Sequence, residues 1–413
     1  MIGLSALNFG PSTVSTRQRV LWIPCLRRLA IFLYSLSSGA RYDGLIDLPP
    51  SPSEPGSTGA SKSPPHVRRT RYAGKNPRRF EDKYKELNPA RYAADVAKVL
   101  ASGKTPAGSH RPIMVAEILE ALALQPGELV ADCTLGFGGH AAELLTRLAP
   151  GGRLIGLDVD PIEHPKTTAR LRAAGWDEDA FTAVRSNFAG LPKVLATLGL
   201  EGVDAVLADL GVSSMQIDDP ARGFTFKNDG PLDLRLNPSR APSATEWLAR
   251  VSVETLAAAF TEHSDEPHAE LLARELVLRQ KKIPLTRTVQ LADSIRATLR
   301  LHKPRLNLEM QDDSVRRVFQ AIRIAVNDEF GALDLFLRHL PRCLNPGGRV
   351  AILTFHSGED RRVKHAFREG LRTGVFSRSN EEVIRAGPDE RRANPRSSSA
   401  KLRWAIRGVL NAT

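Results

Sequence analysis

The sequence predicts an α/β fold in which a mostly parallel sheet carries helices on both faces, and it predicts an all-helical insertion in that fold. Short apolar runs alternate with segments of helical spacing in residues 108–219 and again in 313–413, which is typical of a parallel sheet with crossover helices. The alternation stops between residues 220 and 312, where only helical spacing remains. We therefore expect one α/β core in two parts, 108–219 and 313–413, interrupted by a helical insertion domain at 220–312.

The individual elements follow from the apolar pattern. Apolar runs of strand length predict strands at 129–131, 153–157, 180–185, 203–208, 349–355 and 402–409. Helical spacing predicts core helices at 112–124, from 141 onward, and at 166–174, 314–326, 331–340 and 356–367. In the insertion, Ser243 and Glu246 form a capping box for a helix through Leu248. Further helices are expected at 254–260, 268–281 and 288–299.

The stretch DCTLGFGGH, residues 132–140, joins the first expected strand to the next helix and is rich in glycine. Without a Cβ, Gly136, Gly138 and Gly139 let a ligand approach the backbone closely at this turn. Asp158 ends the second strand about twenty residues later, where a βαβ unit places a carboxylate against a ribose hydroxyl pair. The pattern predicts a nucleoside-containing cofactor. Since Gly136, Gly138 and Ala141 also satisfy the dinucleotide pattern, a nicotinamide cofactor stays open.

Polar side chains follow four successive strands of the expected sheet, at Asp132, Asp158, Asn187 and Asp209. Ligands of open α/β sheets bind beyond the carboxyl ends of the strands. Four such positions in succession therefore predict one site at this edge of the sheet.

The net charge indicates what kind of partner the protein binds, and the cysteine usage indicates the redox state of its cellular compartment. The 413-residue chain has a formal net charge of +12 and a pI of about 9.9, which favours a polyanionic partner. Its three cysteines lie far apart and form no CxxC pair, which argues against a disulfide framework or a zinc cluster and for a reducing compartment. The apolar run at 20–36 is broken by Arg27 and Arg28, so no membrane span and no membrane partner are predicted.

The N-terminal part is expected to lie outside the fold. Residues 1–66 are predicted to be a disordered extension and linker, with Pro, Ser and Gly concentrated at 48–66. Residues 67–107 form a basic arm with a short helix at 92–100, and the arm either contacts RNA or is a solvated tail. Residues 1–42 carry no acid and resemble a transit peptide. The chain is expected in the cytoplasm, or in a mitochondrion or plastid if 1–42 is such a leader.

The insertion is strongly basic, which admits two interpretations. It is either a surface that holds a large anionic substrate or a set of solvated helical faces. The cations concerned are Arg274, Arg279, Lys281, Lys282, Arg287, Arg296, Arg300, Lys303 and Arg305.

A later segment favours S-adenosylmethionine over a nicotinamide cofactor. The run LNPGGRVAILTF, residues 344–355, follows a helix in the way that the sheet of an S-adenosylmethionine-dependent methyltransferase continues, and a strand at 401–409 can insert antiparallel beside it. With this cofactor, Asp158 would take the ribose, Phe188 would pack on the adenine, and Asp132 with the glycine turn would flank the methionine end. A nicotinamide-dependent oxidoreductase remains an alternative, although no hydride-transfer site is evident.

The chain resembles the bacterial 16S ribosomal RNA cytosine-N4 methyltransferase family. The resemblance covers residues 108–410 and consists of long motifs in the family's order. They are HRPIM (110–114), DCTLGFGGH (132–140), GLDVDP (156–161), SNF (186–188), DLGVSSMQIDDPARGFTF (209–226), DGPLDLRLNP (229–238), FQAIRIAVNDE (319–329), FHSGEDRRVK (355–364) and NPRSSSAKLR (394–403).

The resemblance implies a class I, Rossmann-like methyltransferase fold with a seven-stranded sheet. It implies methylation of the exocyclic N4 amine of a cytidine in the decoding centre of small-subunit rRNA, with S-adenosyl-L-methionine as cofactor. The matching cofactor-contacting residues are Gly138, Gly139, His140, Asp158, Phe188, Asp209 and Gln216.

Asp209 is the candidate catalytic residue, as an acceptor for the amine proton, although a purely cofactor-binding role explains it equally well. A homodimer is a further expectation. A third hypothesis is a non-enzymatic RNA-binding assembly factor built on the same scaffold. The chain departs from the family pattern at 264–268, 312–315 and Gly358, and these departures concern substrate details.

Overall fold

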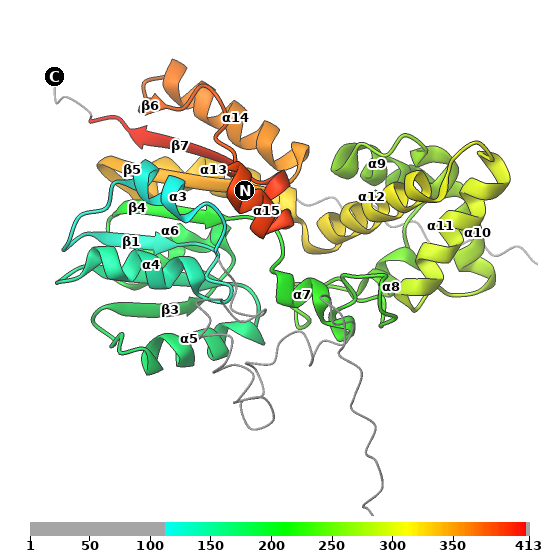
Figure 1. The fold of residues 1–413 in the computed structure, drawn as a ribbon, viewed down its shortest axis with the longest axis horizontal. Helices are drawn as coiled ribbons and strands as arrows, with labels where there is room; N and C mark the ends of the chain where they lie inside the picture. The colour runs from blue at the N-terminus through cyan, green and yellow to red at the C-terminus, as the bar shows by residue number, and fades with distance from the viewer. Residues whose placement is uncertain (1–111, 410–413) are drawn as a thin grey trace, which may run out of the picture. The chain divides into compact units, whose positions relative to one another are not determined.

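The computed structural model describes residues 112–409, and its core is a seven-stranded sheet with the strand order β3-β2-β1-β4-β5-β7-β6 (Figure 1). β1 to β5 are mutually parallel, whereas β7 runs antiparallel between β5 and β6. This confirms the predicted mostly parallel sheet and the antiparallel late strand. The bounds are β1 Leu129–Asp132, β2 Arg153–Asp158, β3 Phe181–Arg185, β4 Val203–Asp209, β5 Leu344–Thr354, β6 Phe376–Ser379 and β7 Lys401–Arg407. The predicted extension, linker, basic arm and helix at 92–100 lie outside the described residues.

Two hydrophobic clusters cover the two faces of the sheet. Neighbouring residues of one strand belong to different clusters, as Val130 and Ala131 show, because successive side chains of a strand point to opposite faces. One face packs against α3 (Val115–Leu122), α4 (Gly139–Leu148) and α5 (Glu163–Ala173). The other packs against α6 (Leu191–Thr197), α13 (Glu329–Cys343) and α14 (Ser357–Arg372). The prediction of helices on both faces is confirmed.

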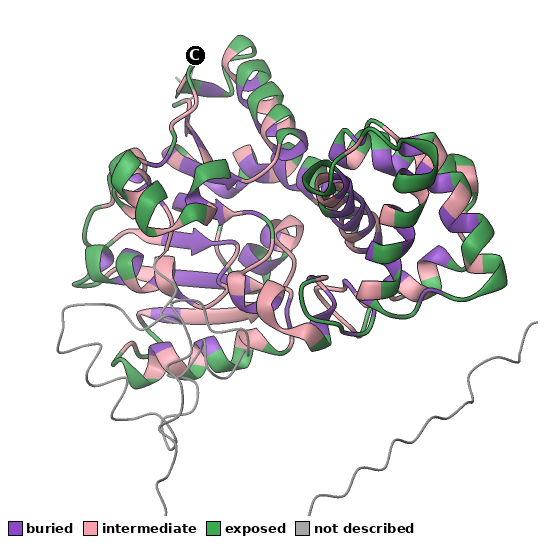
Figure 2. Ribbon diagram, turned by 45° about the vertical axis from the view of Figure 1, so that its right-hand side comes forward, coloured by how far each residue is buried: buried purple, intermediate pink, exposed green. Residues whose placement is uncertain are grey.

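A third hydrophobic cluster belongs to the helical insertion, which lies beside the sheet in Figure 1. Its helices are α8 (Ala244–Leu248), α9 (Val253–Ser264), α10 (Ala269–Lys282), α11 (Thr288–His302) and α12 (Leu308–Asn327). α12 carries buried residues along much of its length and is packed among the other insertion helices (Figure 2). It runs across the boundary that the sequence suggested between residues 312 and 313, and its buried Val315, Val318 and Ile322 pack into the insertion's core.

Four short helices and strands were not predicted: α6, β6, α7 (Ser214–Asp218) and α15 (Pro388–Ala393). Among the described residues, no helix combines the length and the apolar character that a membrane span requires.

The strand order also locates a crevice. β1 lies between β2 and β4, so the connections that leave the carboxyl ends of β1 and β4 turn away from each other. In sheets of this kind a ligand site forms at such a switch point. The candidate site lies there.

Candidate functional site

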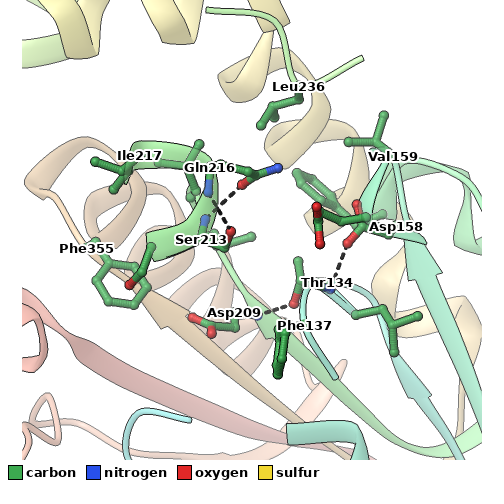
Figure 3. A pocket seen from close by; sticks show the side chains of 18 of the residues that line it. Thr134, Phe137, Asp158, Val159, Asp209, Ser213, Gln216, Ile217, Leu236 and Phe355 are labelled. Atoms are coloured by element: carbon green, nitrogen blue, oxygen red, sulfur yellow. Dashed lines mark hydrogen bonds between the residues drawn. The ribbon is translucent and has the colours of Figure 1, made fainter. Parts of the chain in front are cut away.

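A cavity of about 410 Å³ opens beyond the carboxyl ends of β1 to β5. Its walls are the loops that follow these strands, together with α7, residues of α12 and α13, and residues 394–399 (Figure 3). The cavity brings together all the residues predicted to contact a cofactor, namely Gly138, Gly139, His140, Asp158, Phe188, Asp209 and Gln216.

The glycine turn at the bottom of the cavity requires its glycines. Gly136 and Gly138 have φ values of +49° and +86°, in the left-handed region that L side chains rarely adopt. A Cβ on Gly138 would lie 2.8 Å from Thr167 Cγ2. Gly138 is also the N-cap of α4, and no side chain caps the first N–H groups of this helix. An anionic group at this end of the cavity would therefore be stabilised by the α4 N-terminus.

Asp158 lies at the end of β2, directly across from the glycine turn (Figure 3). Its Oδ2 accepts a hydrogen bond from the Gly136 N–H at 2.7 Å, and its Oδ1 accepts one from the Asp160 N–H at 2.8 Å. Burial raises the pKa of Asp158 from 3.8 to about 6. Each oxygen keeps a second lone pair, so the carboxylate can accept hydrogen bonds from a ribose hydroxyl pair.

An apolar wall stands near this carboxylate. Phe188 packs edge-on against Phe336, with the ring centroids 5.4 Å apart, and the Asn187 side chain holds the turn by accepting a hydrogen bond from the Ala189 N–H. Val159 and Leu236 line the same cavity. These surfaces suit a planar, apolar ring such as adenine.

Gln216 shapes the cavity through contacts with the protein itself. Its Oε1 accepts a hydrogen bond from the Ser213 N–H at 2.8 Å, and its Nε2 donates to Asp160 Oδ2 at 2.7 Å. Ser213 in turn caps α7, so the two residues form a capping box. Only the family resemblance nominated Gln216, although the Ser-x-x-Gln spacing was a local signal for this role.

Sequence reasoning missed the ion pair behind Gln216. Arg222 Nη1 donates to Asp160 Oδ2 at 2.7 Å, and both side chains are almost completely buried. Arg222 Nη2 also donates to the backbone carbonyls of Arg235 and Leu236. This pair ties the end of β2 to the first loop of the insertion. No local pattern announces it, because the partners are 62 residues apart.

Asp132 does not reach the cavity, in contrast to its expected place at the methionine end. It is 1% exposed, and its Oδ1 accepts a hydrogen bond from the Thr134 N–H. Thr134 Oγ1 then accepts a hydrogen bond from the Asp209 N–H at 2.6 Å (Figure 3). Asp132 thus fixes the position of Thr134, and Thr134 links the end of β1 to the end of β4.

Asp209, at the end of β4, carries the least satisfied carboxylate of the cavity. Its Oδ1 has no hydrogen-bond partner among the described residues, and its Oδ2 lies 3.5 Å from His140 Nδ1. Burial, and secondarily the charge of Glu359, raise the pKa of Asp209 from 3.8 to about 7.

The ring of His140 is oriented by the backbone. Its Nε2 lies 2.9 Å from the Ile113 carbonyl, so Nε2 carries the hydrogen and the Nδ1 lone pair faces Asp209. Burial lowers the pKa of His140, which keeps the imidazole neutral. A neutral Nδ1 acceptor beside Asp209 favours a protonated carboxyl there and is consistent with its raised pKa.

A second set of polar side chains lines the cavity beyond the end of β5 and was not singled out from the sequence, although His356 and Glu359 stand in a quoted motif. Glu359 accepts a hydrogen bond from the Phe355 N–H, and its Oε1 lies 3.1 Å from His356 Nε2. Arg323 makes a bidentate pair with Glu329, at 2.8 and 2.9 Å. These groups give the wall fixed charges of both signs.

The cavity fits S-adenosylmethionine part by part. The α4 N-terminus suits the methionine carboxylate, Asp158 suits the ribose and Phe188 suits the adenine. The Asp209 carboxylate, in its ionised form, offers a negative charge to a cationic sulfonium. No group of three His, Cys, Asp or Glu side chains among residues 112–409 is arranged to hold a metal ion.

Comparison with known proteins agrees with this fit. The model of the MraW methylase family matches residues 107–407. Ribosomal RNA small subunit methyltransferase H 1 of Lachnoclostridium phytofermentans is 47% identical over 348 residues, which cover 84% of this chain and 94% of the relative. The protein of the same name from Agathobacter rectalis is 46% identical over 348 residues, covering 84% and 99%. Ribosomal RNA small subunit methyltransferase H of Thioalkalivibrio sulfidiphilus is 42% identical over 322 residues, covering 74% and 99%.

The match spans most of the chain, includes both parts of the α/β core and the insertion between them, and contains every residue of the cavity. The chain therefore belongs to the MraW methylase family, and its cofactor is S-adenosylmethionine.

Proposed function

We propose that this enzyme methylates the exocyclic N4 amine of a cytidine in the decoding centre of small-subunit ribosomal RNA. Three observations support the proposal. The relatives named above are small-subunit rRNA methyltransferases, the ordered motifs resemble those of cytosine-N4 enzymes, and the net charge of +12 suits a polyanionic substrate.

The single observation that carries the choice of an amine is the partly exposed Asp209 carboxylate at the cavity wall. The lone pair of the cytosine amine is delocalised into the ring, so the amine is a weak nucleophile until an acceptor draws positive charge from it. Asp209 lines the cavity with a side chain that is 26% exposed, and its buried Oδ1 has no partner among residues 112–409, so the carboxylate has capacity left to accept a hydrogen bond from that amine.

Bound S-adenosylmethionine supplies a methyl group on a sulfonium, to be displaced in line by a nucleophile. A new N–C bond forms as the C–S bond breaks, and the amine loses one proton. Asp209 takes this proton and becomes a neutral carboxyl, a form that its raised pKa of about 7 makes accessible near neutral pH. Burial of the carboxyl, and secondarily the charge of Glu359, account for that raised pKa.

The test is a methylation assay on small subunits from a strain that lacks N4 methylation, with labelled cofactor. After digestion to nucleosides, we expect the label in N4-methylcytidine from one position of the decoding centre. Label in 5-methylcytidine, in another nucleoside or in none would contradict the proposal. Asp209→Asn serves as the matched variant, since it keeps the shape of the side chain and removes the proton acceptor.

The two other hypotheses are tested with the same protein. A nicotinamide-dependent enzyme would bind NADH, whereas we expect calorimetry to detect S-adenosylhomocysteine only. A non-enzymatic assembly factor would keep its cellular function in the Asp158→Ala variant, whereas we expect that function to be lost. We also propose a homodimer in the cytoplasm, which light scattering and N-terminal sequencing of the natural protein would test.

A further inference from the structure

A second cavity, of about 590 Å³, adjoins the cofactor cavity. It is lined by the end of β3, by α6 and by the loop at 237–240 of the insertion. Val159, Ser186 and Asn187 line both cavities, and Figure 3 shows Val159 at the rim of the first. A ligand in the second cavity would therefore lie next to the cofactor.

The two cavities differ in charge. Carboxylates of Asp158, Asp209 and Glu359 line the cofactor cavity, whereas the residues that line the second include no Asp or Glu. Its charged side chains are those of Arg185, Lys193 and Arg240. The second cavity is therefore purely cationic.

These three cations have no counter-charge in the described chain. All three residues are exposed, and none forms an ion pair with another residue of 112–409. They come from three separate elements, so the fold itself holds like charges around one hollow. Such an arrangement lowers stability through repulsion unless an anion binds there.

The cofactor cannot be that anion. S-adenosylmethionine carries a sulfonium and an ammonium against a single carboxylate and has no phosphate. An RNA strand carries one phosphate per nucleotide, and cations with hydroxyl and amide groups nearby are the usual contacts of its backbone. Asn237 and Ser239 provide such polar groups at the same cavity.

We propose that the second cavity binds the phosphodiester backbone of the substrate RNA beside the target nucleotide, with Arg185, Lys193 and Arg240 as the phosphate contacts. This inference rests on the proposed function, since it assigns a surface to the same substrate. It places backbone recognition on the β3 and α6 side of the cofactor, and it makes the loop at 237–240 a part of the substrate site.

The experiment compares two triple variants of the full chain with the same loss of charge. The first is Arg185→Ala with Lys193→Ala and Arg240→Ala. The control is Arg147→Ala with Lys364→Ala and Arg368→Ala, which removes three exposed cations that line neither cavity and have no ion pair among the described residues. Binding to small subunits is measured between about 50 and 200 mM salt, the range in which phosphate contacts change affinity most visibly.

Each lost phosphate contact should flatten the plot of log K against log salt by about 0.7 to 0.9. We therefore expect a slope smaller by about two to three for the first variant and an unchanged slope for the control. The KM for small subunits should rise about tenfold or more in the first variant, with kcat nearly unchanged, because backbone contacts bind ground state and transition state alike. The Kd for S-adenosylhomocysteine should equal that of the wild type.

Two results overturn the inference: a first variant whose slope and KM match those of the control, or one that loses cofactor affinity, which would make the cavity part of the cofactor site. Failure of the proposed function looks different. In that case the wild type itself does not bind small subunits or does not form N4-methylcytidine.

Discussion

Removal of the Arg222 guanidinium should destabilise the protein far more than removal of an equally close surface arginine. Arg222 and Asp160 lie 2.7 Å apart with side chains only 8% and 1% exposed. In Arg222→Ala, Asp160 Oδ2 keeps only the hydrogen bond from Gln216, and the carbonyls of Arg235 and Leu236 lose their donor. Loss of one partner from a buried pair costs about 3–5 kcal/mol, because the remaining charge is left without compensation.

The matched control is Arg287→Ala. Arg287 and Asp229 are also 2.7 Å apart, but their side chains are 46% and 44% exposed. Such a pair contributes about 0–1 kcal/mol. Urea unfolding followed by circular dichroism gives the free energy of unfolding of both variants. Equal costs for Arg222→Ala and Arg287→Ala would refute the assignment of Arg222 as a clamp between β2 and the insertion.

Cofactor affinity provides a second measurement of the same clamp. Gln216 and Leu236 line the cofactor cavity and are held by Asp160 and Arg222 respectively. We expect Arg222→Ala to weaken S-adenosylhomocysteine binding in calorimetry, and Arg287→Ala to leave it unchanged.

Three further predictions concern the cavity. The methylation rate should fall as pH drops through about 7, because Asp209 then becomes protonated and cannot accept the amine proton. Asp209→Asn should lower kcat about 10²- to 10⁴-fold, and its pH–rate profile should no longer show this fall. Gly138→Ala should cost about 1–3 kcal/mol in backbone strain and should weaken cofactor binding, because the new Cβ would also press on Thr167. The control Gly199→Ala, at φ +69° with open space around its Cβ, should lower the melting temperature through strain alone and leave the cofactor affinity measured by calorimetry unchanged. Wild-type stability should fall by up to about 3 kcal/mol as pH rises from about 4 to above 6, because the folded-state pKa of Asp158 is raised from 3.8 to about 6. Asp158→Asn should lose cofactor affinity and this part of the pH dependence in urea unfolding; a variant that keeps the full dependence would contradict the cause.

The parallel core could be predicted because its strands are buried on both faces. Runs such as residues 205–208 are continuously apolar and buried for that reason, and the polar and turn residues that follow them mark their ends. β6 was not predicted because it is mostly exposed. It is four residues long, and of these only Phe376 is buried, so its sequence has no strand pattern apart from its pairing with β7.

The start of α12 could have been located more accurately. Asn307 caps the helix by accepting a hydrogen bond from the Met310 N–H, a signal that lies upstream of the suggested boundary at residue 312. The helix is long because its face is buried by α9 and α11, and this packing is a tertiary property that spacing alone does not reveal.

The parts of the site that depend on one loop were visible in the sequence, and those that depend on distant partners were not. The glycine turn and Asp158 follow from a local βαβ pattern. The orientation of His140 toward Asp209 depends on the Ile113 carbonyl, and the acidic environment of Asp209 depends on Glu359, 150 residues later in the chain. Such contacts arise only when the strand ends meet.

The most direct test of the central claim is a crystal structure of the protein soaked with S-adenosylhomocysteine. We predict density for the ligand in the cavity beyond β1 to β5, with the ribose hydroxyls at Asp158, the adenine on Phe188 and the carboxylate at the start of α4. A ligand bound elsewhere, or a cavity that stays closed by its own side chains at saturating ligand, would contradict the account.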